Sequence, residues 1–179
     1  MTIAKRLTLL LAVPLLVLAV LGLFVWYQLN HIEIKNKFVG VQIESLAVIG
    51  NISQCLTEMR VSTRNYFLSE DKDEQARAEK AVLQNAADLK RLLARYGDSL
   101  VTGDKDRRLF NDVLDLSRQW SVEAHKLMVF SASGKRSDGL SLLLSGTFPE
   151  LGTRLGNALN EWIKHNEELA VDAGTASRD

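Results

Sequence analysis

An unbroken apolar run opens the chain. Residues 7–27 read LTLLLAVPLLVLAVLGLFVWY and contain no charged residue. About 20 helical residues at about 1.5 Å each cross the hydrocarbon core of a bilayer, and Trp26 and Tyr27 at the end of the run favour the membrane–water interface. A cleaved signal peptide has a shorter apolar core, of about 7–15 residues, and a small-residue cleavage site. The run therefore predicts a retained transmembrane helix over residues 7–30.

The charges before this run predict its orientation. Lys5 and Arg6 precede it, and residues 1–6 contain no acidic residue. Short segments rich in Lys and Arg stay on the cytoplasmic side of the membrane. We therefore expect residues 1–6 in the cytoplasm, an anchor in the inner membrane, and residues 31–173 in the periplasm.

Beyond the apolar run, hydrophobic residues recur every three or four positions, and no further proline occurs until Pro149. This period is typical of amphipathic helices and not of strands. Gly97 stands where a left-handed C-terminal cap is expected, and Gly146 with Pro149 should bend or interrupt the last segment. Four helical segments can be separated, the first continuing the membrane helix, at about residues 39–68, 71–97, 104–132 and 138–173.

The apolar stripes of these segments predict the core. Asp71 and Glu74 resemble an N-cap and its reciprocal partner at the start of the second segment. Trp120 and Trp162 fall on stripes, so we expect both to be packed inside. The second stripe comprises Ala76, Leu83, Ala86, Leu89, Leu93 and Tyr96, and the fourth comprises Leu144, Phe148, Leu151, Leu155, Leu159, Trp162 and Leu169. The predicted fold is all-α: an N-terminal transmembrane helix that continues into an antiparallel up-down-up-down four-helix bundle.

Composition narrows the possible functions. The 179 residues include 22 basic and 22 acidic side chains. Setting aside Lys5 and Arg6 leaves 20 basic against 22 acidic residues, a net charge of −2, which disfavours nucleic acid as a partner. Cys55 is the single cysteine, so no internal disulfide forms, and we interpret it as a small core residue.

The sequence carries no pattern that indicates catalysis. Its three histidines are scattered without Cys or acidic neighbours at ligand spacing, so we expect no metal, haem or other cofactor. Phosphate-binding, hydrolase and metalloprotease motifs do not occur either. We therefore expect a protein that is not an enzyme.

One polar strip stands out on the first segment. Ser53, Thr57, Arg60 and Arg64 follow one another at steps of four, three and four, beside the apolar stripe and pointing away from the bundle centre. Two arginines at this spacing repel weakly, whereas the planar fork of each binds a carboxylate bidentately. The strip is either an anion-binding site, a solvated face, or part of an ion pair with Glu58 or Glu70.

The stretch RVSTRNYFLSED, residues 60–71, at the distal turn of a helix that continues from the membrane, resembles the ligand-binding module of methyl-accepting chemotaxis receptors of the four-helix-bundle type. In that family, arginines near the distal end of the first helix hold the ligand's carboxylate at the interface of a homodimer. Arg60 and Arg64 match the spacing of two of them, and a third family arginine falls on Cys55. The resemblance implies a small anionic ligand, an organic acid or amino acid, or a ligand-loaded binding protein.

The resemblance also implies partners elsewhere in the chain. Thr153 of the fourth segment, with Thr147 or Arg154, would complete such a pocket. Residues 174–179 would lead toward a second transmembrane helix and a cytoplasmic signalling part not present in this chain. Histidine kinases and diguanylate cyclases use the same input module, and a membrane-anchored interaction protein is the third alternative.

Overall fold

The computed structural model describes residues 3–176, with side chains described at residues 18, 20–27 and 39–175. This part of the chain forms helices and no strand, which confirms the all-α prediction. Its five helices are α1 (Ile3–Leu68), α2 (Lys72–Ser99), α3 (Gly103–Ala132), α4 (Arg136–Leu144) and α5 (Thr147–Ala176).

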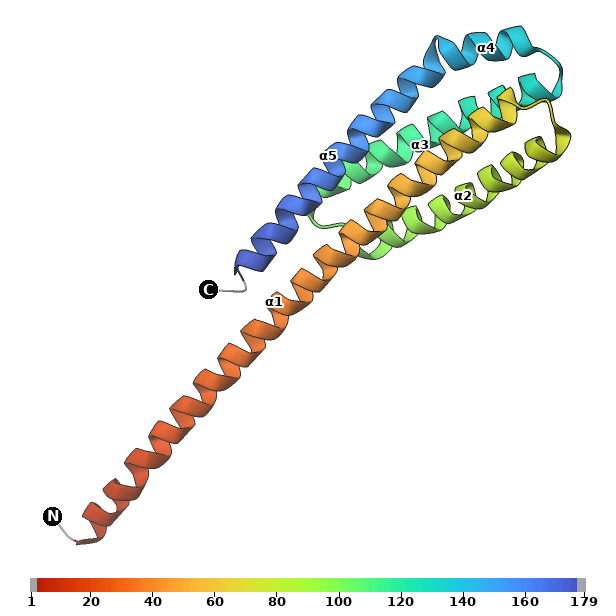
Figure 1. The fold of residues 1–179 in the computed structure, drawn as a ribbon. Coiled ribbons are helices and arrows are strands. Elements are labelled where there is room, and N and C mark those ends of the chain that lie inside the picture. The colour runs from red at the N-terminus through yellow and green to blue at the C-terminus, as the bar shows by residue number, and fades with distance from the viewer. Residues whose placement is uncertain (1–2, 177–179) are drawn as a thin grey trace.

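Helix α1 is continuous and runs far beyond the bundle at its N-terminal end (Figure 1). The predicted span, residues 7–30, is helical throughout, although the side chains of residues 7–17, 19 and 28–30 lie outside those described. The large apolar side chains described in this part are exposed, Leu23 to 67% and Trp26 to 68%. Exposed apolar side chains in such number are typical of a helix that packs against apolar surroundings outside its own chain.

A second stretch of α1, Val39–Leu68, is also long and apolar enough to cross a membrane. Its apolar side chains have a different environment, because Ile49 and Ile52 are fully buried among the other helices. Packing in the bundle accounts for the composition of this stretch.

The distal half of α1 forms an antiparallel bundle with α2, α3 and the combined α4 and α5 (Figure 1). The C-terminal end of α5 lies beside α1 at the end of the bundle where α1 leaves it (Figure 1). Helix α1 packs extensively on α2 and α5, and α3 packs on α5, whereas α2 and α3 touch at few points. The bundle therefore has three closed edges and one loose edge.

A single apolar core runs through the bundle and contains Trp120 and Trp162, exposed to 1% and 0%, as predicted. The predicted stripe of α2 is partly wrong, because Leu83 is 65% exposed and Ala76 is exposed, while Val82 is buried. Leu83 precedes the buried Leu89 by six positions, roughly 120° around a helix, whereas Val82 precedes it by seven, nearly two full turns.

The predicted interruption of the fourth segment is confirmed. Helix α4 ends at Leu144, α5 begins at Thr147, and Gly146 between them has φ 87°, a left-handed value that favours glycine. Pro149 lies in the first turn of α5, where its missing N–H is tolerated. Leu144, predicted on the core stripe, is 75% exposed because the break changes the helical register.

Two predicted caps differ from the structure. Asp71 does cap α2, accepting from the Asp73 N–H at 2.8 Å, but Glu74 accepts the Ser69 hydroxyl at 2.8 Å instead of the Asp71 N–H. Gly97 lies inside α2 and is not its cap. A Cβ there would lie 3.0 Å from Cζ of Phe110, so this glycine provides room for an aromatic ring of α3.

Candidate functional site

Arg60 bridges the first and last helices. It lies on α1, is half-buried, and its Nη2–H donates to the Gly152 carbonyl of α5 at 2.6 Å. The Nε atom is buried without a hydrogen-bond partner. Burial lowers the pKa of Arg60, because desolvation disfavours the charged guanidinium. The predicted orientation away from the bundle is therefore wrong for Arg60, which faces α5.

Arg64 lies one turn further along α1 and is exposed. Neither arginine forms an ion pair within the described residues. The acidic partners considered from the sequence are engaged elsewhere: Glu58 accepts from Gln54 at 2.9 Å, and Glu70 lies 3.7 Å from Arg136. Two neighbouring cations thus stand without a counter-charge.

Both arginines line one groove of about 430 Å³ between α1 and α5. Trp120 of α3 and Leu143 of α4 contribute apolar wall, and α5 contributes Phe148, Pro149, Gly152, Thr153, Gly156, Asn157 and Asn160. The groove therefore combines two cations with a hydroxyl and two amides over an apolar base, donors and acceptors suited to a small polar anion.

Two glycines four residues apart leave this groove open. A Cβ built at Gly152 or Gly156 would meet no atom within 4 Å. The empty space beside α5 therefore results from the absence of side chains at these two positions, and larger residues would fill it.

The structure brings together three of the five predicted site residues, Arg60, Arg64 and Thr153. The Thr153 hydroxyl currently donates to the Pro149 carbonyl at 3.1 Å. Ser53 and Thr57 lie outside the groove lining, and the Thr57 hydroxyl donates to the Ser53 carbonyl at 2.9 Å.

The two further residues considered on the fourth segment also lie outside the groove. Thr147 is exposed at the start of α5, and Arg154 has Nη1 4.0 Å from a carboxylate oxygen of Glu150. Arg154 is thus a neighbouring cation that differs from Arg60 and Arg64 in having a partner.

A second polar cluster, missed from the sequence, surrounds the fully buried Asp106 at the opposite end of the bundle. Its carboxylate accepts from Trp162 Nε1–H at 2.7 Å, Asn166 Nδ2–H at 3.0 Å and the Thr102 N–H at 2.7 Å. The Tyr96 hydroxyl lies 2.9 Å from both carboxylate oxygens. This cluster ties α2, α3 and α5 together where the chain approaches the extension of α1.

Electrostatics keep the tyrosine of this cluster neutral. Burial raises the pKa of Tyr96 well above its ordinary value, and the neighbouring Asp106 carboxylate raises it further. A sequence signal for the cluster existed, because Asp106 precedes Leu109 by three positions and Asn166 follows Trp162 by four, so both fall on core stripes.

These features define an antiparallel helical-bundle protein in which the last helix ends beside the first, and the first continues beyond the bundle as an apolar extension. All 179 residues match the family described as "Four helix bundle sensory module for signal transduction", and the chain belongs to it. It is therefore a four-helix-bundle sensory module of methyl-accepting chemotaxis signal transduction, which confirms the resemblance. Searches of curated proteins and of solved structures found no match.

Proposed function

We propose that this module senses a small carboxylate on the outer side of the membrane and is part of a transmembrane chemotaxis receptor. The proposal rests on two guanidinium groups, those of Arg60 and Arg64, which lie in one groove between α1 and α5 without an acidic partner among the described residues. We propose a sensory and not a catalytic role.

The chemistry of the groove favours an anion. Arg60 has already lost part of its hydration, and its single hydrogen bond to Gly152 leaves other guanidinium donors unused. A carboxylate would supply the missing negative charge and accept from both arginines in charge-assisted hydrogen bonds. Thr153, Asn157 and Asn160 would then bind the remaining polar groups of the ligand.

Binding in this groove would affect signalling because its walls belong to two different helices. The arginines lie on α1, and the other polar groups lie on α5. A ligand that contacts both favours whichever relative position of the two helices brings those groups together. We propose that this preference moves α5 slightly against α1 and so carries the signal along the helix axes.

The proposal includes a membrane anchor and a second subunit. Residues 7–30 would span the inner membrane, with residues 1–6 in the cytoplasm and the bundle in the periplasm, as the charges of Lys5 and Arg6 predict. Ile43 and Val61 are 62% and 51% exposed on α1, an outer face that we propose packs against α1 of a second copy.

Thermal-shift measurements on a fragment of residues 31–179 test the ligand proposal. A panel of small organic acids and amino acids is screened, and we expect at least one carboxylate to raise the unfolding midpoint. Each charged contact in a partly desolvated site is worth about 1.5–3 kcal/mol, so Arg60→Ala and Arg64→Ala should each weaken binding about 10- to 100-fold.

The matched control is Arg154→Ala, which removes an exposed cation of α5 next to the groove but outside its lining. It should leave carboxylate binding unchanged. Equal stabilisation of the wild-type fragment, Arg60→Ala and Arg64→Ala by every active carboxylate would show that these arginines are not the binding site.

A further inference from the structure

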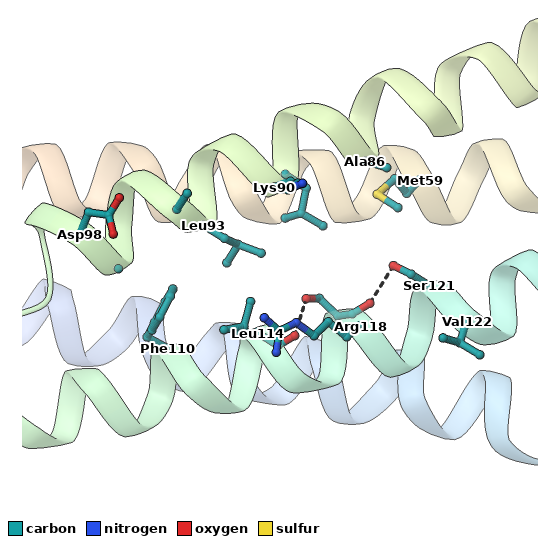
Figure 2. A pocket seen from close by; sticks show the side chains of 14 residues that line it. Met59, Ala86, Lys90, Leu93, Asp98, Phe110, Leu114, Arg118, Ser121 and Val122 are labelled. Atoms are coloured by element: carbon teal, nitrogen blue, oxygen red, sulfur yellow. Dashed lines mark hydrogen bonds between the residues drawn. The ribbon is translucent and has the colours of Figure 1, made fainter.

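The loose edge of the bundle encloses a second, larger hollow. A cleft of about 770 Å³ lies between α2 and α3, with Met59 of α1 among its lining residues (Figure 2). Leu89 and Leu93 line it from α2, and Phe110 and Leu114 line it from α3. Its volume is that of a typical small-molecule site, and it shares no lining residue with the arginine groove.

The inner surface of this cleft is apolar, and its two serine hydroxyls already have hydrogen-bond acceptors within the protein. The two hydroxyls on its α3 wall are already used: Ser117 donates to the Leu114 carbonyl, and Ser121 donates to the Ser117 carbonyl, both at 2.8 Å (Figure 2). A ligand therefore meets carbon surfaces inside the cleft and no unsatisfied hydroxyl of these serines. An apolar group would be stabilised there by leaving water.

The rim of the cleft is charged. Lys90 of α2 and Arg118 of α3 stand on opposite walls, at a similar position along the bundle (Figure 2). Lys90 forms no ion pair within the described residues, and Arg118 has only a loose one, with Nη1 3.6 Å from Asp115. The single acidic lining residue, Asp98, lies toward the Phe110 end (Figure 2). The middle of the rim is therefore positive.

We propose that this cleft binds an amphipathic carboxylate, a molecule with a phenyl ring or short alkyl chain and one anionic head. The apolar body lies between the leucine-lined walls, and the head lies between Lys90 and Arg118. The charge distribution excludes a cationic head at this position and makes a neutral molecule bind more weakly.

A bound molecule would also contact the polar cluster indirectly. The Phe110 ring lies 5.7 Å from the Tyr96 ring and 5.9 Å from the Trp162 ring, measured between centroids. Trp162 belongs to α5 and donates to Asp106. The cleft is thus one aromatic contact away from the helix that we propose transmits the signal.

The three methionines of the chain allow a direct test with methyl-¹³C-methionine NMR. Met59 lines the cleft, Met128 lines only the adjoining hollow further along α2 and α3, and Met1 serves as reference. The full chain is reconstituted in lipid nanodiscs, because detergent monomers share the chemistry of the proposed ligand. Titration with 3-phenylpropionate should move the Met59 signal most, Met128 less and Met1 not at all.

Variants and matched probes then test the recognition. Lys90→Gln and Arg118→Gln should each weaken 3-phenylpropionate binding about two- to fivefold, as for exposed ion pairs, whereas Arg108→Gln, an exposed cation of α3 outside the cleft, should not. Acetate, which lacks the apolar body, and 3-phenylpropanol, which lacks the charge, should both bind more weakly. Arg64→Ala should leave binding unchanged, which separates this site from the arginine groove.

Two results would overturn the proposal. In the first, the Met59 signal does not move up to millimolar 3-phenylpropionate. In the second, the probe binds Lys90→Gln and Arg118→Gln as tightly as the wild type.

Discussion

The two opposite edges of the bundle, α1 with α5 and α2 with α3, are built differently. The α1–α5 edge is bridged by the Arg60 hydrogen bond to Gly152, and its groove is lined with cations, amides and a hydroxyl. The α2–α3 edge has an apolar cleft, and the side-chain bond that links its two helices is the one from Tyr96 to Asp106 at one end. One edge is polar and bridged toward the end at which α5 begins, whereas the other is apolar and open.

This difference matches the arrangement of the four helices at the end of the bundle from which α1 extends. Helix α5 ends beside α1 at the end of the bundle from which α1 extends, whereas α2 and α3 join each other there through residues 100–102 (Figure 1). Directional hydrogen bonds fix the register of two helices more closely than apolar contacts do. A small displacement of α5 along α1 therefore has defined start and end positions at the polar edge.

Asp106 of α3 ties α2 and α5 to its own helix, so its loss has the largest expected effect. Asp106→Ala removes the acceptor of Trp162 Nε1–H, Asn166 Nδ2–H and the Thr102 N–H inside the protein. Leaving such donors unpaired costs about 1–3 kcal/mol each, and we expect the free energy of unfolding to fall by about 3 kcal/mol or more. Urea unfolding of the fragment of residues 31–179 measures it.

Asp112→Ala, which removes an exposed carboxylate from the same helix, is the control and should change the free energy of unfolding by less than about 0.5 kcal/mol. Equal effects of the two substitutions would mean that the buried cluster does not hold α2, α3 and α5 together.

The fold could be predicted from the sequence because its signals are local. Helix periodicity, the Asp71 cap and the break at Gly146 depend on residues close together in the chain, and the structure confirms them. The cap expected at Gly97 was wrong because a distant ring, Phe110, decides the use of that glycine. Such a contact depends on tertiary packing, which no local pattern contains.

The candidate site could be predicted only in part, both on α1 and on α5, because Arg60, Arg64 and Thr153 line the groove whereas Ser53 and Thr57 do not. The spacing of Arg60 and Arg64 identified the two cations, but their neighbour across the groove depends on the helical register after the break at Gly146. That register places Thr153 in the groove and Arg154 beside Glu150. Asp106 was missed because its partners Trp162 and Asn166 lie on a distant helix, and only tertiary packing brings them to it.

Gly139 of α4 and Gly156 of α5 allow a second test, with a smaller expected effect, of how tightly these two helices are packed. A Cβ at Gly139 of α4 would lie 2.2 Å from Cε2 of the buried Phe67, so Gly139→Ala should lower the free energy of unfolding by about 1–3 kcal/mol. Gly156→Ala adds a Cβ to open space in the polar groove and should raise it by about 0.5–1 kcal/mol. Thermal or urea unfolding of both variants provides the measurement. Stabilisation by Gly139→Ala would show that α4 is not held against α1.

The smallest expected effect concerns Cys55, which reports whether α2 stays packed on α1 beside the open cleft. Cys55 is half-buried on α1, and burial raises the pKa of its thiol, with the nearby Asp88 and Glu58 carboxylates raising it further. Because the folded pKa exceeds the unfolded one, the thiol contributes stability below the unfolded pKa and loses it as pH rises through the folded pKa. At pH 8 the folded chain therefore has less thiolate than the unfolded chain.

Since thiolate is the reactive form, iodoacetamide should modify Cys55 several-fold more slowly in the native fragment than in urea, and the difference should shrink as pH rises. Mass spectrometry follows the single cysteine without ambiguity.

Adding 3-phenylpropionate should leave the native rate unchanged, because the cleft lies on the other side of α2 and Cys55 does not line it. A native rate equal to the rate in urea would mean that α2 separates from α1 as well as from α3. The open α2–α3 edge would then reflect a loosely held helix and not a binding cleft.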